Sequence, residues 1–129
     1  MSTSRSKVRT AVSIKRAYES PSPSDGTRVL VDRLWPRGLK KSDAAIVQWM
    51  KEIAPSNELR QWFGHDVARW EEFRRRYEAE LAAKGDLLGE LREMAEKGPL
   101  TLIYSARDEV HNQAVVLRER ILHCSSGIT

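Results

Sequence analysis

The chain has 129 residues, 40% of them hydrophobic, which is enough for one core but not for two. It contains no apolar run of the roughly 18 residues that a membrane span needs and no signal peptide, and its single cysteine excludes an internal disulfide, so we expect a soluble cytoplasmic protein. The net charge is +4, but residues 1–16 carry five basic residues and no acidic one, so the rest of the chain is nearly neutral. The high pI is therefore weak evidence for nucleic-acid binding.

Three segments in the first half of the chain are predicted to be strands. Residues 10–18 alternate between polar and apolar side chains and precede a loop rich in Ser and Pro. Residues 28–34 form an apolar run rich in β-branched side chains, which is typical of a buried strand. Residues 46–53 are short and alternating, and we interpret them as a third strand, with a helix as the alternative.

The second half of the chain is predominantly helical. Apolar side chains recur every three or four residues between 67 and 81, as in an amphipathic helix that begins after Asp66. Residues 100–104 are short and entirely apolar apart from one threonine, which predicts a buried fourth strand before the last helix. The helices are predicted at 56–64, at 67–81, from 86 to the Gly98-Pro99 stop signal, and at 110–122.

The alternation of strands and helices predicts an α/β fold. Parallel neighbours need a crossover connection, and both faces of the sheet must be covered. We therefore expect a small open, mainly parallel sheet with helices on both faces. It would form a single domain over residues 10–124, between a basic tail at 1–9 and a short tail at 125–129.

Two arginines lie at or just after the carboxyl end of the second predicted strand. Ligands of open α/β sheets bind at the carboxyl ends of the strands, where loops and helix N-termini meet. Arg33 and Arg37 lie there, in a loop that Pro36 stiffens, and their planar guanidinium groups suit a carboxylate or phosphate. The structural alternative is that Asp32 pairs with Arg33.

A second group of polar side chains follows the fourth predicted strand. Ser105, Arg107, Asp108, His111 and Asn112 lie in the turn into the last helix, where a helix needs only one capping residue. The simplest interpretation makes Asp108 the N-cap and Arg107 its ion-pair partner. The functional interpretation makes Arg107 a ligand contact and His111 an acid–base group. We expect Arg37 and Arg107 to face one common cleft.

His65 lies between two residues that have structural explanations of their own. Gly64 can end one helix and Asp66 can cap the next, whereas His65 is a surface residue or an acid–base group. A metal site built from His65, Asp66 and His111 has no supporting ligand spacing, so no metal is predicted. The sequence also lacks the motifs of serine hydrolases, Rossmann dehydrogenases and P-loop NTPases, and it predicts no particular cofactor or oligomeric state.

The sequence resembles the domain of unknown function 488 (DUF488) family, in its short YeaO-like branch, over residues 12–122. The resemblance rests on several specific segments spread along the chain. They are KRAY at 15–18, VDRLWPRG at 31–38, KEIAPS at 51–56, LRQWFGHD at 59–66, WEEFRRRYEAEL at 70–81 and YSARDEVHNQAVVL at 104–117. The resemblance implies a compact α/β fold but carries over no reaction. Proteins of other branches of the family have cysteines in the segment that corresponds to residues 104–112. This chain has no cysteine there, which argues against thiol chemistry.

Three functions remain in competition. The first is a hydrolase or sensor that takes a phosphate ester or nucleotide-like anion. Its acid–base candidates are His111, His65 and Asp108, and its binding candidates are Arg33, Arg37, Arg107, Asn112 and Ser105. The second is a protein that binds nucleic-acid backbones through its basic N-terminal arm. The third is a binding or structural module in which the polar turn only stabilises the fold.

Overall fold

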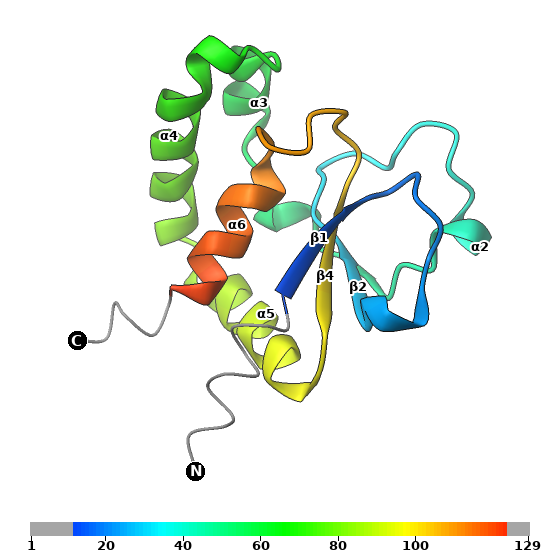
Figure 1. The fold of residues 1–129 in the computed structure, drawn as a ribbon. Coiled ribbons are helices and arrows are strands. Elements are labelled where there is room, and N and C mark those ends of the chain that lie inside the picture. The colour runs from blue at the N-terminus through cyan, green and yellow to red at the C-terminus, as the bar shows by residue number, and fades with distance from the viewer. Residues whose placement is uncertain (1–11, 124–129) are drawn as a thin grey trace.

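A computed structural model of the chain describes residues 12–123 and is shown in Figure 1. The tails predicted at 1–9 and 125–129 lie outside these residues. Within residues 12–123, no helix combines the length and the apolar character needed to cross a membrane.

The described part of the chain forms a four-stranded sheet in the order β1-β4-β2-β3. The strands are β1 (Val12–Arg16), β2 (Thr27–Leu30), β3 (Gln48–Trp49) and β4 (Leu100–Tyr104). Every neighbouring pair is parallel, which confirms the predicted α/β class. All five residues of β4 are buried, because it has a strand on each side and is covered on both faces.

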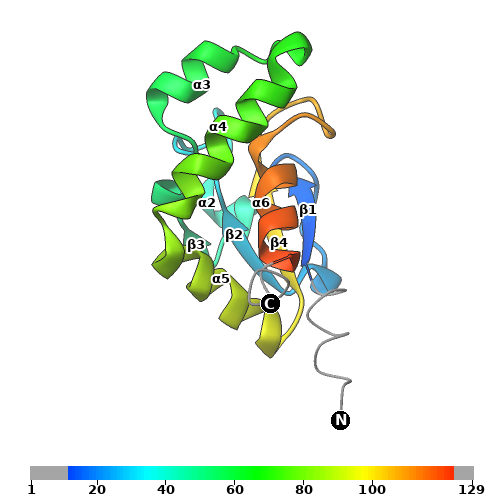
Figure 2. The ribbon, with the colours of Figure 1, turned by 90° about the vertical axis from the view of Figure 1, so that its left-hand side faces the viewer.

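Helices lie on both faces of the sheet, in unequal amounts. One face is covered by α4 (Trp70–Ala82), α5 (Gly85–Lys97) and α6 (Gln113–Leu122), which stand in front of the strands in Figure 2. The other face carries a smaller apolar cluster, to which Trp35 and Trp49 contribute, and the four-residue helix α2 (Lys41–Ala44). Helix α3 (Asn57–Phe63) packs against α4.

The third strand is shorter than the predicted 46–53. Its ladder covers only Gln48 and Trp49, which pair with the last two residues of β2. Met50 still donates its N–H to the carbonyl of Leu30, at 2.9 Å, but the chain then turns into a 3₁₀ turn at Lys51–Ile53. β2 itself ends at Leu30, and after Val31, whose N–H still donates to the carbonyl of Ile103 at 2.9 Å, the chain turns toward the site described below.

The last helix begins later than predicted, and Asp108 is not its N-cap. Asn112 takes that place, since its Oδ1 accepts from the N–H of Val115 at 3.2 Å. Asp108 instead closes the preceding turn, with Oδ1 accepting from the N–H groups of Val110 and His111, both at 2.9 Å. The two caps are linked, because Asn112 Nδ2 donates to the carbonyl of Asp108 at 2.8 Å. The sequence therefore contains two capping residues, Asp108 and Asn112, and the buried Asn112 is the one that starts α6.

Candidate anion-binding site

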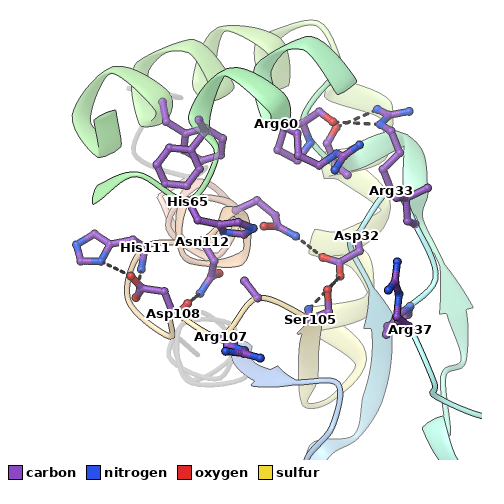
Figure 3. Close-up of a pocket in the computed structure, with 18 of the residues that line it drawn as sticks. Asp32, Arg33, Arg37, Arg60, His65, Ser105, Arg107, Asp108, His111 and Asn112 are labelled. Carbon is purple, nitrogen blue, oxygen red and sulfur yellow. Dashed lines mark hydrogen bonds and ion pairs between the residues drawn. The ribbon is translucent and has the colours of Figure 1, made fainter. Parts of the chain in front are cut away.

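A cavity of about 690 Å³ opens at the carboxyl ends of the parallel strands, between the loops that follow β2 and β4 and helix α3 (Figure 3). The two loops meet here, as the parallel topology led us to expect. Every site residue predicted from the sequence lies in the wall of this cavity. They are Arg33, Arg37, His65, Ser105, Arg107, Asp108, His111 and Asn112.

A polar cluster, which we call the polar floor, consists of the buried Asp32 and the half-buried Ser105 and Gln113. Asp32 is only 8% exposed. Its Oδ2 accepts from the N–H of Ser105 at 3.0 Å and from the Ser105 hydroxyl at 2.5 Å, and its Oδ1 accepts from Gln113 Nε2. Burial raises the pKa of the Asp32 carboxyl, although these hydrogen bonds act in the opposite direction. Asp32 thus connects the ends of β2 and β4 to the start of α6.

Three exposed arginines, Arg37, Arg60 and Arg107, surround the cavity, and we call them the cationic rim. Figure 3 shows them reaching the cavity from three separate segments. Among residues 12–123, the guanidinium groups of Arg37 and Arg107 have no ion pair and no hydrogen bond, so Arg107 does not pair with Asp108. The guanidinium group of Arg60 donates, within the described residues, only to Asn57 Oδ1, at 3.3 Å. Arg37 and Arg107 therefore carry positive charges with which no carboxylate of the described residues forms an ion pair.

Arg33 differs from the rim arginines. Its Nε donates to the carbonyl of Pro55 at 3.1 Å and its Nη2 to the carbonyl of Ala54 at 3.2 Å. Its Nη1 lies 3.9 Å from the carboxylate of Glu52, and no ion pair with Asp32 is formed within the described chain. Arg33 therefore fixes the loop after β3 as a wall of the cavity.

Two histidines lie at the cavity in different settings. His65 is exposed, has a φ of +59°, and directs its imidazole toward the cavity in Figure 3. His111 is half-buried, with Nδ1 2.9 Å from Asp108 Oδ2 and its ring edge-on to Trp70 at 5.2 Å. Hydrogen bonds from the backbone N–H groups of Val110 and His111 lower the pKa of Asp108. Asp108 therefore acts as a hydrogen-bond partner of His111.

Several residues of the site were not predicted. Asp32 lies near the carboxyl end of the second predicted strand, and this position could have identified it. Gln113 gave no such signal, because it lies within the predicted last helix at 110–122. Arg60 has no local signal, because only the packing of α3 brings it to the cavity. Tyr18 also lines the cavity, and its hydroxyl donates to the carbonyl of Arg37 at 2.9 Å. Within residues 12–123, no three His, Cys, Asp or Glu side chains are grouped as metal ligands would be.

Comparison with known proteins agrees with the sequence motifs. The profile of the inactive DUF488-N3 subclade matches residues 11–126, nearly the whole chain. The protein belongs to the DUF488 family. It is 48% identical over 108 residues to the uncharacterised protein YeaO of Escherichia coli, which covers 84% of this chain and 94% of YeaO. Uncharacterised proteins of Mycobacterium bovis and Mycobacterium tuberculosis are 41% identical over 110 residues, covering 85% of this chain and 92% of theirs. No solved structure matches the chain.

Proposed function

We propose that this DUF488 protein binds a small anionic ligand of the phosphate-ester type in the cavity and does not turn it over. The observation that carries the proposal is the cationic rim. Its three arginines come from different segments and face one cavity, and no carboxylate pairs with Arg37 or Arg107 in the described chain. Guanidinium groups in this arrangement suit a phosphate, because each can donate two parallel hydrogen bonds.

Two observations support binding rather than catalysis. The subclade to which the chain is matched is described as inactive. In addition, the Ser105 hydroxyl already donates to Asp32, and the Asp108 carboxylate is occupied by His111 and two backbone N–H groups. A hydrolase would instead use His65, His111 and Asp108 as acid–base groups, and would release inorganic phosphate from the bound ester. The nucleic-acid alternative depends on the basic arm, most of which lies outside the described residues.

Replacing Arg107 with lysine tests the proposal, because lysine keeps the charge but loses the planar fork. Binding of pyrophosphate would be measured by isothermal titration calorimetry, with phosphate release from organic esters followed in parallel. A charge-assisted hydrogen bond contributes about 1.5 to 3 kcal/mol, so we expect Arg107→Lys to fold normally and to bind roughly tenfold or more weakly.

The matched control is Arg75→Lys, which changes an exposed arginine of α4 that pairs with Glu72 and does not line the cavity. This variant should bind as the unmodified protein does. Equal affinity in Arg107→Lys would contradict the proposed role of the rim, and phosphate release that depends on His65 or His111 would favour the hydrolase.

A further inference from the structure

The cavity has two chemically different ends. At its opening lie the exposed guanidinium groups of the cationic rim, which attract an anion. At its buried end lies the polar floor, whose central residue, Asp32, is itself acidic and 8% exposed. An anion placed against the floor would meet the carboxyl oxygens of Asp32. The phosphate of a ligand therefore belongs at the rim, and a different part of the ligand must face the floor.

The polar floor accepts hydrogen bonds more readily than it donates them. Among residues 12–123, Asp32 Oδ1 receives one donor, Gln113 Nε2, although a carboxylate oxygen can accept two. Gln113 lines the cavity as well, and no described residue donates to its Oε1. The Ser105 hydroxyl already donates its one hydrogen bond to Asp32, so it has none left for a ligand. A group that reaches the floor must therefore supply N–H or O–H donors, as the hydroxyls of a sugar or an amino group on a ring do.

The electrostatics of Asp32 support the same conclusion. Burial raises the pKa of its carboxyl even with three protein hydrogen bonds in place, because these donors only partly replace the lost water. A fourth donor from a ligand would stabilise the ionised form. The cationic Arg60, which also lines the cavity, acts in the same direction.

The size and walls of the cavity indicate an organic ligand. A volume of about 690 Å³ far exceeds the space a single phosphate fills and lies within the range of sites for small organic molecules. Apolar surface from Pro55, Phe63 and Phe73 contributes to the lining. A ligand that spans from the rim to the floor would place its carbon skeleton against these side chains.

We infer that the ligand is an organic phosphate, with its phosphate at Arg37, Arg60 and Arg107 and with hydroxyl or amino donors bound to Asp32 and Gln113. This inference rests on the proposed function and makes Asp32 a residue that determines specificity. A nucleotide and a sugar phosphate share this chemistry, and they differ in whether a planar ring fills the apolar part of the cavity.

Four probes separate the contributions of the two ends: inorganic phosphate, methyl phosphate, ribose 5-phosphate and AMP. Methyl phosphate carries the anion without donors, and ribose 5-phosphate adds hydroxyls. Calorimetry should show ribose 5-phosphate or AMP binding at least tenfold more tightly than methyl phosphate. If AMP binds more tightly than ribose 5-phosphate, the ligand class is a nucleotide. If AMP binds equally or more weakly, the ligand class is a sugar phosphate.

Asp32→Asn provides the second measurement. It should reduce the advantage of the donor-bearing probes over methyl phosphate at least fivefold, because the neutral amide accepts hydrogen bonds less strongly than the carboxylate. If this variant does not fold, Gln113→Ala replaces it. The probe series on the unmodified protein still tests whether donor-bearing ligands bind more tightly than methyl phosphate.

The outcomes distinguish the two proposals. Failure of all four probes to bind overturns the proposed function. Binding of all four with similar affinities, or an advantage of the organic probes that Asp32→Asn leaves intact, keeps the anion site and overturns this inference.

Discussion

His65 holds a backbone conformation that glycine adopts readily and other residues rarely do. Its φ is +59°, and the preceding Gly64 has a φ of +53°, so two consecutive residues are left-handed. A side chain in this region costs about 1 to 2 kcal/mol relative to the ordinary helical conformation. With the backbone in this conformation, the imidazole of His65 points to the cavity. A histidine at such a position is consistent with a role in ligand binding that outweighs its cost in stability.

His65→Gly should therefore make the protein more stable and a weaker binder. We expect the free energy of unfolding to rise by up to about 1 kcal/mol, because relief of the strain exceeds the greater entropy of glycine in the unfolded chain. Urea denaturation measures the stability and calorimetry with pyrophosphate measures the affinity. His65→Ala is the control, since it removes the imidazole but keeps the strain, and it should lose affinity without gaining stability. Unchanged affinity in both variants would make His65 a surface residue.

At the scale of elements, α4 holds one wall of the cavity. The hydroxyl of Tyr77 in α4 donates to the carbonyl of Ile53 at 2.7 Å, and Lys84, which lies between α4 and α5, donates its Nζ to the carbonyl of Ala54 at 3.1 Å. Glu80 accepts from the N–H and the hydroxyl of Ser56, at 2.9 and 2.6 Å. Together with Arg33, these contacts fix a loop that has little regular structure of its own. The loop is therefore a preorganised part of the site.

The start of α6 gives a second prediction, because two caps precede it. Asn112→Ala should lower the free energy of unfolding by about 1 to 2 kcal/mol, since it removes the N-cap of α6 and a buried hydrogen bond to the carbonyl of Asp108. Asp108→Ala removes only the closure of a more exposed turn and should cost less. Urea denaturation of both variants measures the difference. A larger loss for Asp108→Ala would mean that the helix is stabilised from the earlier cap.

At the scale of the whole molecule, the end of the sheet opposite the cavity depends on one close contact. Gly26 has a φ of +65°, and a Cβ at this position would lie 2.2 Å from the carbonyl oxygen of Pro99. Thr27, the first residue of β2, donates its N–H to the same oxygen at 2.9 Å. The turns that begin β2 and β4 can therefore meet only if residue 26 has no side chain.

Gly26→Ala should destabilise the whole domain by about 3 kcal/mol or more, because it combines backbone strain with a clash against backbone atoms that cannot move freely. Gly89→Ala is the matched control, since the Cβ that it would add in the middle of α5 meets no atom within 4 Å beyond its chain neighbours and the adjacent helix backbone. This control should gain about 0.5 to 1 kcal/mol from higher helix propensity. Thermal and urea unfolding measure both, and equal stabilities of the two variants would show that the contact at Pro99 is dispensable.

The sequence by itself determined the α/β class and the location of the candidate site. Apolar strands that alternate with helices predict a parallel sheet, because parallel neighbours need crossover connections. In such a sheet the carboxyl ends of all strands lie at one edge. For this reason Arg37 and Arg107, which are 70 positions apart, could be predicted to face one cavity. The same reasoning could have included Asp32.

Only the tertiary structure decided what each of these side chains does. Arg33 and Arg37 look equivalent in the sequence, but the Arg33 guanidinium donates to the carbonyl of Pro55, whereas the Arg37 guanidinium has no ion pair or hydrogen bond in the described chain. Asn112 rather than Asp108 starts α6, and Arg60 reaches the site through helix packing. The physical reason is the same in each case. Local sequence patterns report periodicity and burial, whereas the partner of a polar group depends on which distant backbone and side-chain atoms the fold brings within hydrogen-bonding distance.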